Sequence, residues 1–153
     1  MEKDTVAALA CVILMFVSGC KDDTSAPVNH PRRFTIEFND VSSNRVASGI
    51  IQLPSRQPED KSCAGRCEIT VPNPPAKPAT RLEYALVCFS QNTGTFSGRM
   101  NDGHFRIDLA PQADDNTISL EGVLDGKRAR GKWYYQSFAG YDEIGTWEGK
   151  DFP

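Results

Sequence analysis

Histidine, serine and aspartate are often combined for nucleophilic catalysis. In this chain, few residues of these types have a spacing that would suit a catalytic site. The chain has two histidines, His30 and His104. His104 shares a predicted strand with Asp108, and Ser97 lies on the same polar face of the preceding strand. The sequence lacks a Gly-x-Ser-x-Gly motif, the strained turn that presents a catalytic serine. We therefore expect no catalytic residues and no enzymatic activity.

The N-terminal segment has the features of a targeting signal. Residues 6–17 (VAALACVILMFV) form an unbroken apolar run of 12 residues. A membrane-spanning helix needs about 20 apolar residues, whereas the shorter run is typical of the core of a signal peptide. Two small residues, Ser18 and Gly19, and then Cys20 follow this segment.

The sequence from Val17 to Cys20 resembles the lipobox of bacterial lipoproteins, which has an aliphatic residue, two small residues and a cysteine. The resemblance implies cleavage between Gly19 and Cys20, diacylglycerol on the Cys20 sulfur and a fatty acid on the new N-terminus. Lys21 stands where this family's inner-membrane retention signal would place aspartate, which favours the outer membrane. The protein is then expected in the bacterial cell envelope, held on a membrane by lipid.

The chain divides into three expected regions. Residues 1–19 form the signal peptide, and residues 20–33 form a polar, flexible tether after the lipidated cysteine. Residues 34–153 form a single β domain, which contains a proline-rich flap over residues 54–78.

Three further cysteines, Cys63, Cys67 and Cys88, would remain beside the lipidated one. An exported protein meets an oxidising compartment, which favours a disulfide. A Cys67–Cys88 bond would close a loop of about 20 residues and contribute roughly 3 kcal/mol; the alternative is a small Cys63–Cys67 loop. The CAGRC spacing, without a nearby histidine, does not fit a zinc site. We expect neither a metal nor another cofactor.

The charged residues bear on the kind of partner. With 17 basic and 20 acidic side chains the formal net charge is −3, which argues against a nucleic-acid partner. Arg128, Arg130 and Lys132 nevertheless share one face of a predicted strand, and Arg99 and Arg106 lie on another hairpin. These side chains form either a basic stripe for an anionic partner or a solvated outer face that resists edge pairing.

The hydrophobic pattern from Phe34 onward alternates with the period of β-strands. Strands are predicted over 34–41, 45–53 and 80–90, the last of them central because apolar residues occupy both of its faces. Asp102-Gly103 and Asp125-Gly126 each join two alternating runs, which predicts hairpins with type I′ turns. A last strand is predicted over 143–150, with Ile144 and Trp147 on opposite faces.

The segment from Pro54 to Pro78 interrupts this pattern, because it holds six of the ten prolines. Proline cannot donate to a sheet ladder, so most of the segment is predicted to be an ordered loop. Residues 67–71 form at best a short edge strand.

Sequential hairpins with short connections predict an antiparallel meander of seven to nine strands. We expect an all-β fold that closes into a small β-barrel, with a two-sheet β-sandwich as the alternative. The segment GKWYYQSFAGYDEIGTWEGK (131–150) has a limited similarity to the paired G-x-W and G-T-W hairpin of small lipocalin- or streptavidin-like barrels.

Aromatic side chains gather in the last hairpin and its loop, where Phe138, Tyr141 and Tyr134 are the expected partner-binding residues. Tyrosine and other aromatic residues are enriched at protein interfaces. The first functional hypothesis is therefore a non-catalytic binding module for an envelope protein, of the inhibitor, immunity or assembly-accessory type.

The alternative hypothesis is a carrier that holds a small hydrophobic ligand inside the barrel, as lipocalin-like proteins do. It predicts a cavity lined by Phe96, Phe105 and Trp133. Filled interiors are common in barrels of eight strands, and a co-purifying small molecule, sought by mass spectrometry of an organic extract, would separate the two hypotheses.

Overall fold

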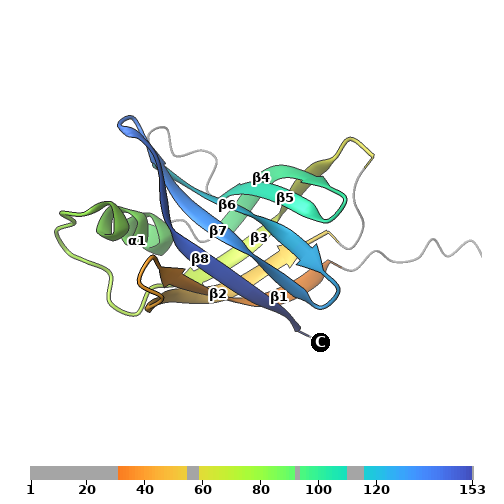
Figure 1. Ribbon diagram of the computed structural model, residues 1–153, viewed down its shortest axis with the longest axis horizontal. Coiled ribbons are helices and arrows are strands. Elements are labelled where there is room, and N and C mark those ends of the chain that lie inside the picture. The colour runs from red at the N-terminus through yellow and green to blue at the C-terminus, as the bar shows by residue number, and fades with distance from the viewer. Residues whose placement is uncertain (1–30, 55–58, 92–93, 110–115, 153) are drawn as a thin grey trace, which may run out of the picture.

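The computed structural model, which describes residues 31–54, 59–91, 94–109 and 116–152, is a closed barrel of eight strands (Figure 1). Each strand pairs antiparallel with the next in sequence, and β8 pairs with β1 to close the circle. The predicted all-β meander, and the preference for a barrel over a sandwich, are confirmed. The elements are β1 (Arg32–Asp40), β2 (Arg45–Leu53), β3 (Ser62–Thr70), α1 (Arg81–Gln91), β4 (Gly94–Asn101), β5 (His104–Leu109), β6 (Asn116–Asp125), β7 (Arg128–Ser137) and β8 (Gly140–Phe152).

The interior of the barrel is packed with large side chains. Alternation along β1 buries Phe34, Ile36 and Phe38 and leaves Thr35 and Glu37 exposed. Seven aromatic side chains from the strands are each at most 5% exposed: Phe34, Phe38, Phe96, Phe105, Trp133, Tyr135 and Trp147. Burying one such side chain contributes about 1.5–3 kcal/mol, so these residues dominate the stability of the fold.

Both predicted hairpins are present with the expected register, but their turns differ. Asp102 and Gly103 both have positive φ, which is the type I′ conformation expected for Asp-Gly. In the second hairpin Asp125 pairs with Arg128, so the two central residues are Gly126 and Lys127. Only Gly126 has positive φ, which is the type II′ pattern. The expected type I′ turn is therefore wrong at this position.

The predicted central strand over 80–90 is wrong, because these residues form helix α1. Thr80 and Glu83 make a capping box: Glu83 Oε2 accepts from the Thr80 backbone N–H at 3.0 Å, and Thr80 Oγ1 accepts from the Glu83 N–H at 3.2 Å. Apolar residues then follow at helical spacing and face the barrel: Leu82, Ala85, Leu86 and Phe89. With the period of a strand, the apolar residues of this segment fall on both faces. With the period of a helix, the same residues form a single apolar stripe.

Helix α1 covers one end of the barrel, the end at which β7 turns into β8 (Figure 1). Phe89 packs between Phe38 and Trp133, with ring centroids 4.6 and 5.0 Å apart. Arg81 forms an ion pair with Asp142 of β8 at 3.2 Å. The barrel is thus closed by a helical plug at this end.

The proline-rich segment is a loop only in part. Residues Ser62–Thr70 form β3, which pairs with β2 on one side and β4 on the other. The expected short edge strand over 67–71 is therefore wrong, since β3 is longer and paired on both sides. The six prolines of the segment all lie outside β3, so none removes a ladder hydrogen bond within it.

The structure contains neither of the two expected disulfides, because Cys63, Cys67 and Cys88 are all buried thiols. Cys63 and Cys67 face inward on the same strand, four residues apart. At about 3.3 Å per residue their Cα atoms lie some 13 Å apart, beyond the roughly 7 Å reach of a disulfide. Cys88 lies on α1, not on the strand that would have brought it beside Cys67. Burial raises the pKa of the Cys63 thiol to about 11.

Strand β8 differs from the prediction in one respect. Ile144 and Trp147 are both buried, although the alternation places them on opposite faces. The register between β7 and β8 shifts at Trp133/Tyr134, which is a β-bulge. A bulge adds one residue to one strand and resets the alternation, so both side chains reach the core.

Candidate functional site

Two neighbouring rows of side chains cross the outer wall of the barrel from β4 to β8. The strand register aligns the first row as Arg99, Arg106, Glu121, Lys132 and Thr146. It aligns the second row as Asn101, His104, Val123, Arg130 and Glu148. Because alternate residues of a strand share a face, the two rows lie side by side.

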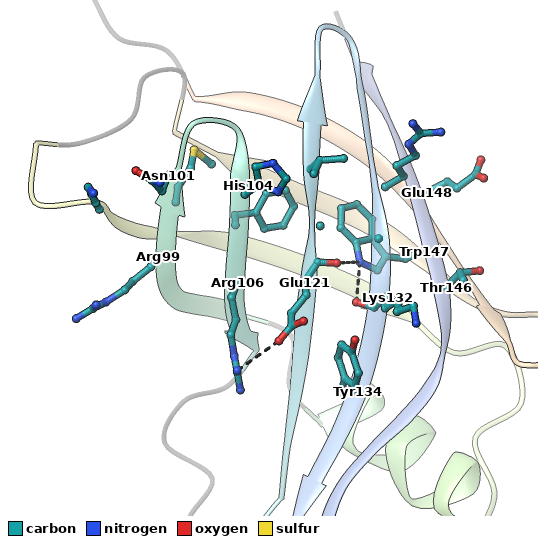
Figure 2. Close-up of a pocket in the computed structure, with 17 residues that line it drawn as sticks. Arg99, Asn101, His104, Arg106, Glu121, Lys132, Tyr134, Thr146, Trp147 and Glu148 are labelled. Carbon is teal, nitrogen blue, oxygen red and sulfur yellow. Dashed lines mark hydrogen bonds and ion pairs between the residues drawn. The ribbon is translucent and has the colours of Figure 1, made fainter.

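These ten residues line an open groove of about 960 Å³ (Figure 2). Lys61 and Tyr134 also line the groove, and the inward-facing Phe105 and Trp147 belong to its floor. Gly122 and Gly131, which pair across β6 and β7, also lie in the floor. Both glycines stand at inward-facing positions, between the outward-facing residues of the two rows.

Trp147 is held tightly beneath the groove. Its indole Nε1 donates hydrogen bonds to the Lys132 and Glu121 carbonyl oxygens, at 3.1 and 3.3 Å (Figure 2). A Cβ on Gly122 would lie 2.5 Å from Cζ2 of the indole. Glycine at this position therefore allows the indole to reach the wall, where its polar edge is satisfied by the backbone of the groove.

The groove is electropositive although the chain as a whole is acidic. Five cationic side chains and two carboxylates line it, a formal charge of +3: Lys61, Arg99, Arg106, Arg130 and Lys132 against Glu121 and Glu148. Arg106 pairs with Glu121 at 3.3 Å, and Lys132 pairs with Glu143 at 2.8 Å, which raises the pKa of Lys132. Within the part of the chain that the structure describes, no carboxylate forms an ion pair with Lys61, Arg99 or Arg130.

Two tyrosines extend the groove along β7 and β8. Tyr134 and Tyr141 stack with ring centroids 4.6 Å apart and an angle of 15° between their planes. The Tyr141 hydroxyl donates to Glu121 Oε1 at 3.1 Å, and the Arg106 guanidinium lies 5.2 Å from the centre of the Tyr141 ring. Burial raises the pKa of the Tyr141 hydroxyl, so it remains a neutral hydrogen-bond donor.

Phe138 occupies the turn between β7 and β8 and is 88% exposed. The predicted contact residues are therefore arranged on one hairpin, with Phe138 at its tip and Tyr134 and Tyr141 stacked beside the groove. An exposed phenylalanine contributes nothing to the core, and contact with another surface would remove its apolar area from water.

Four of the five basic residues singled out in the sequence line the groove, and Arg128 is the one that does not. The outer surface of β4–β5 and that of β6–β7 are joined by the pairing of Arg106 with Glu121. Sequence analysis predicted the β4–β5 and β6–β7 hairpins separately, and it did not predict how the two hairpins lie relative to each other.

The residues considered for catalysis are not gathered into one site. Ser97 lies opposite Asp108 in the register, and Asp108 accepts a hydrogen bond from the Ser119 hydroxyl. His104 begins β5, four residues from Asp108, and pairs with Asn101 and Val123 instead. Across the described ranges, no three histidine, cysteine, aspartate or glutamate side chains lie close enough to hold a metal ion.

The side chains expected to line an internal cavity belong to the packed core. Trp133 lies against Phe38 and Phe89, and its indole Nε1 donates to the Asn39 carbonyl at 2.9 Å. Phe105 packs against Trp147 with ring centroids 5.5 Å apart. Phe96 is buried to the same degree, so all three rings lie inside the barrel among other core side chains.

Several residues of the groove were missed in the sequence. Lys61 fell within the presumed flap, and Glu121, Glu148 and Trp147 were not connected with the basic residues. The Asp102-Gly103 turn fixes Arg99 opposite Arg106, and this like-charged pair is a signal that the sequence does contain. The partners contributed by β8 depend on the bulge and could not be found in this way.

The expected cleavage and lipidation residues, Gly19 and Cys20, lie outside the described residues. None of the helices in the described part is both long and apolar enough to cross a membrane. Comparison of the chain with protein-family models, with curated proteins and with solved structures finds no significant match in any of the three.

Proposed function

We propose that the protein is a lipid-anchored, non-catalytic binding module that captures a protein of the bacterial envelope through the outer surface of β4–β8. The observation that carries this proposal is the charged groove on the outer wall, together with the exposed Phe138 at the tip of the β7–β8 hairpin, on a barrel whose interior is filled. A filled interior leaves the outside as the place for recognition. Open, shallow surfaces suit a macromolecule, whereas small-molecule sites enclose most of their ligand.

The position of the chain ends supports the same function. β1 begins at Arg32, which pairs with Asp151 near the C-terminus, at the end of the barrel opposite α1 (Figure 1). A lipid on Cys20 would be attached to the chain shortly before β1, which begins at this end of the barrel. The turn that carries Phe138 lies at the far end, so the anchor would hold this aromatic residue away from the membrane.

The lipid anchor is tested by the intact mass of protein purified from membranes. The proposal predicts a chain that begins at Cys20 and carries fatty acyl groups. An unmodified mass, or an intact N-terminal segment, would contradict the anchor and leave the binding surface to be tested alone.

The binding surface is tested by capture of envelope proteins with two matched variants. Phe138→Ser removes the exposed ring at the tip of the β7–β8 hairpin, and Phe152→Ser removes an exposed ring at the last residue of β8. Loss of a well-buried aromatic contact costs about 2 kcal/mol, or roughly thirtyfold in affinity. We expect this loss for Phe138→Ser only. Equal capture by both variants would refute the proposed surface.

A further inference from the structure

The groove contains an arrangement of charges that the barrel itself does not require. Arg99 lies directly opposite Arg106 on the outer face, and like charges in this position destabilise a sheet. On its other side Arg99 faces Ser62. Arg106 has a compensating neighbour in Glu121, whereas no carboxylate in the described part of the chain pairs with Arg99.

A second cation without an ion pair lies in the neighbouring row, although its cross-strand neighbour is a glutamate rather than another arginine. Arg130 faces Val123 on one side and Glu148 on the other, and it makes no ion pair within the described ranges. The exposed cations of the two rows therefore leave an excess of positive charge over one continuous surface. A guanidinium presents a rigid fork of donors that matches the two oxygens of a carboxylate.

The groove is not only charged. Between the cations the outward-facing Val123 and the floor of Phe105 and Trp147 are apolar, and Tyr134 borders the groove. An occupant that matched this surface would carry carboxylates together with apolar side chains. A protein segment rich in aspartate or glutamate supplies both kinds of group, whereas an acidic polysaccharide supplies carboxylates among hydroxyl groups.

We propose that this groove binds an acidic segment of a protein partner, with Arg99 and Arg130 as the residues that hold its carboxylates. The inference rests on the proposed function, because it specifies the chemistry of the surface that the captured protein presents. Arg106 and Lys132 are already paired with glutamates of the barrel and would position the neighbouring groups. The outward-facing Val123 contacts the side chains between the carboxylates.

The test uses two fluorescein-labelled peptides, one of alternating glutamate and tyrosine and one of alternating glutamine and tyrosine. Binding is followed by anisotropy with the native protein, an Arg99→Gln/Arg130→Gln variant and an Arg45→Gln control. Arg45 is an exposed arginine on another wall, paired with Glu37. We expect the acidic peptide alone to bind, with a loss of about tenfold or more in the double variant and no change in the control.

A spectroscopic readout locates the bound peptide without any substitution. The two tryptophans give two indole N–H signals in a ¹⁵N–¹H correlation spectrum. Trp147 Nε1 donates to the backbone of the groove, whereas Trp133 Nε1 donates to Asn39 on another strand. The acidic peptide should shift the Trp147 signal and leave the Trp133 signal in place. Ionic strength of about 1 M, where the Debye length is about 3 Å, should abolish the shift.

The other outcomes overturn the inference. Equal binding by the native protein and the double variant would mean that the groove does not hold the carboxylates. Binding of a polyuronate chain but not of the acidic peptide would show that the groove binds an acidic polysaccharide instead. A double variant that still captured the envelope partner, while Phe138→Ser did not, would refute the acidic segment and leave the proposed function intact. The reverse result would refute the proposed contact at Phe138 and leave the acidic-segment site standing.

Discussion

Arg99 and Arg106 lie opposite each other on the outer face of β4 and β5, two positive charges in directly paired strand positions. Neither side chain supports the core, because both point away from it. A sheet selected for stability alone would place opposite charges, or a charge and a polar group, at such a pair. We attribute the pair to the proposed binding of an acidic segment.

Arg99→Glu should therefore stabilise the barrel while it weakens binding of an acidic peptide. The new carboxylate would face Arg106 and replace repulsion by attraction, a gain of about 0.5 kcal/mol in the free energy of unfolding. Urea denaturation measures the stability, and anisotropy with the glutamate–tyrosine peptide measures the binding. A destabilised variant would show that the arginine pair is a structural feature of the sheet.

Helix α1 should lose its N-terminal cap in acid. Hydrogen bonds from the Ala79 and Thr80 amides lower the pKa of Glu83 below its ordinary value of 4.5. The carboxylate form is thus favoured by folding, and this stabilisation is present above pH 4.5 and lost as the pH falls through the lowered pKa. The two amide signals should shift together below pH 4.5, and they should not titrate in Glu83→Gln.

The same cap can be weakened at neutral pH. Thr80→Ala removes the hydroxyl that accepts from the Glu83 N–H, which should cost about 1 kcal/mol. Because Phe89 on this helix packs against Phe38 and Trp133, the loss should appear in the unfolding of the whole barrel. A change confined to the helix would show that α1 is not part of the core.

Two glycines on β7 and its turn provide a matched test of strand packing. A Cβ on Gly131 would lie 1.8 Å from the Glu121 carbonyl oxygen, whereas a Cβ on Gly126 would meet nothing within 4 Å. Gly131→Ala should cost about 3 kcal/mol because the two strands must separate. Gly126→Ala should cost only about 1–2 kcal/mol, the strain of its left-handed conformation. Similar losses would contradict the close approach of β6 and β7.

The three buried thiols should react slowly in the folded protein. Burial raises the pKa of Cys63 to about 11, and the thiolate is the reactive form. Alkylation of Cys63 at pH 8 should therefore be much slower in native than in denatured protein, as peptide mapping by mass spectrometry would measure. A Cys67–Cys88 linked peptide would contradict the thiol state of the structure.

Much of the barrel could be predicted from local sequence. The alternating apolar residues of β1 and the two Asp-Gly hairpins specify which side chains enter the core, and two hairpin registers follow from them. Helix α1 was not predicted, because its apolar residues were interpreted with the period of a strand. Thr80 and Glu83 have the spacing of a capping box, which is a signal for the start of a helix. Strand β3 was missed because the prolines on both sides hid its own alternation.

The groove could be predicted only in part for a different reason. The arginines were visible as residues of two separate hairpins, and their union depends on the pairing of β5 with β6. The contribution of Trp147 depends on the bulge at Trp133/Tyr134 and on the absence of a side chain at Gly122. These are properties of the closed barrel, and no local pattern encodes them.

The most direct measurement is photo-crosslinking in envelope membranes from two positions on the outer wall. Benzoylphenylalanine replaces Val123, which faces the groove, or Ile50, which lines a smaller pocket on β2. The proposed function predicts a protein adduct from position 123 but not from position 50, and mass spectrometry should find an acidic segment at the crosslink. The same adducts from both positions, or only lipid or small-molecule adducts from position 123, would contradict it.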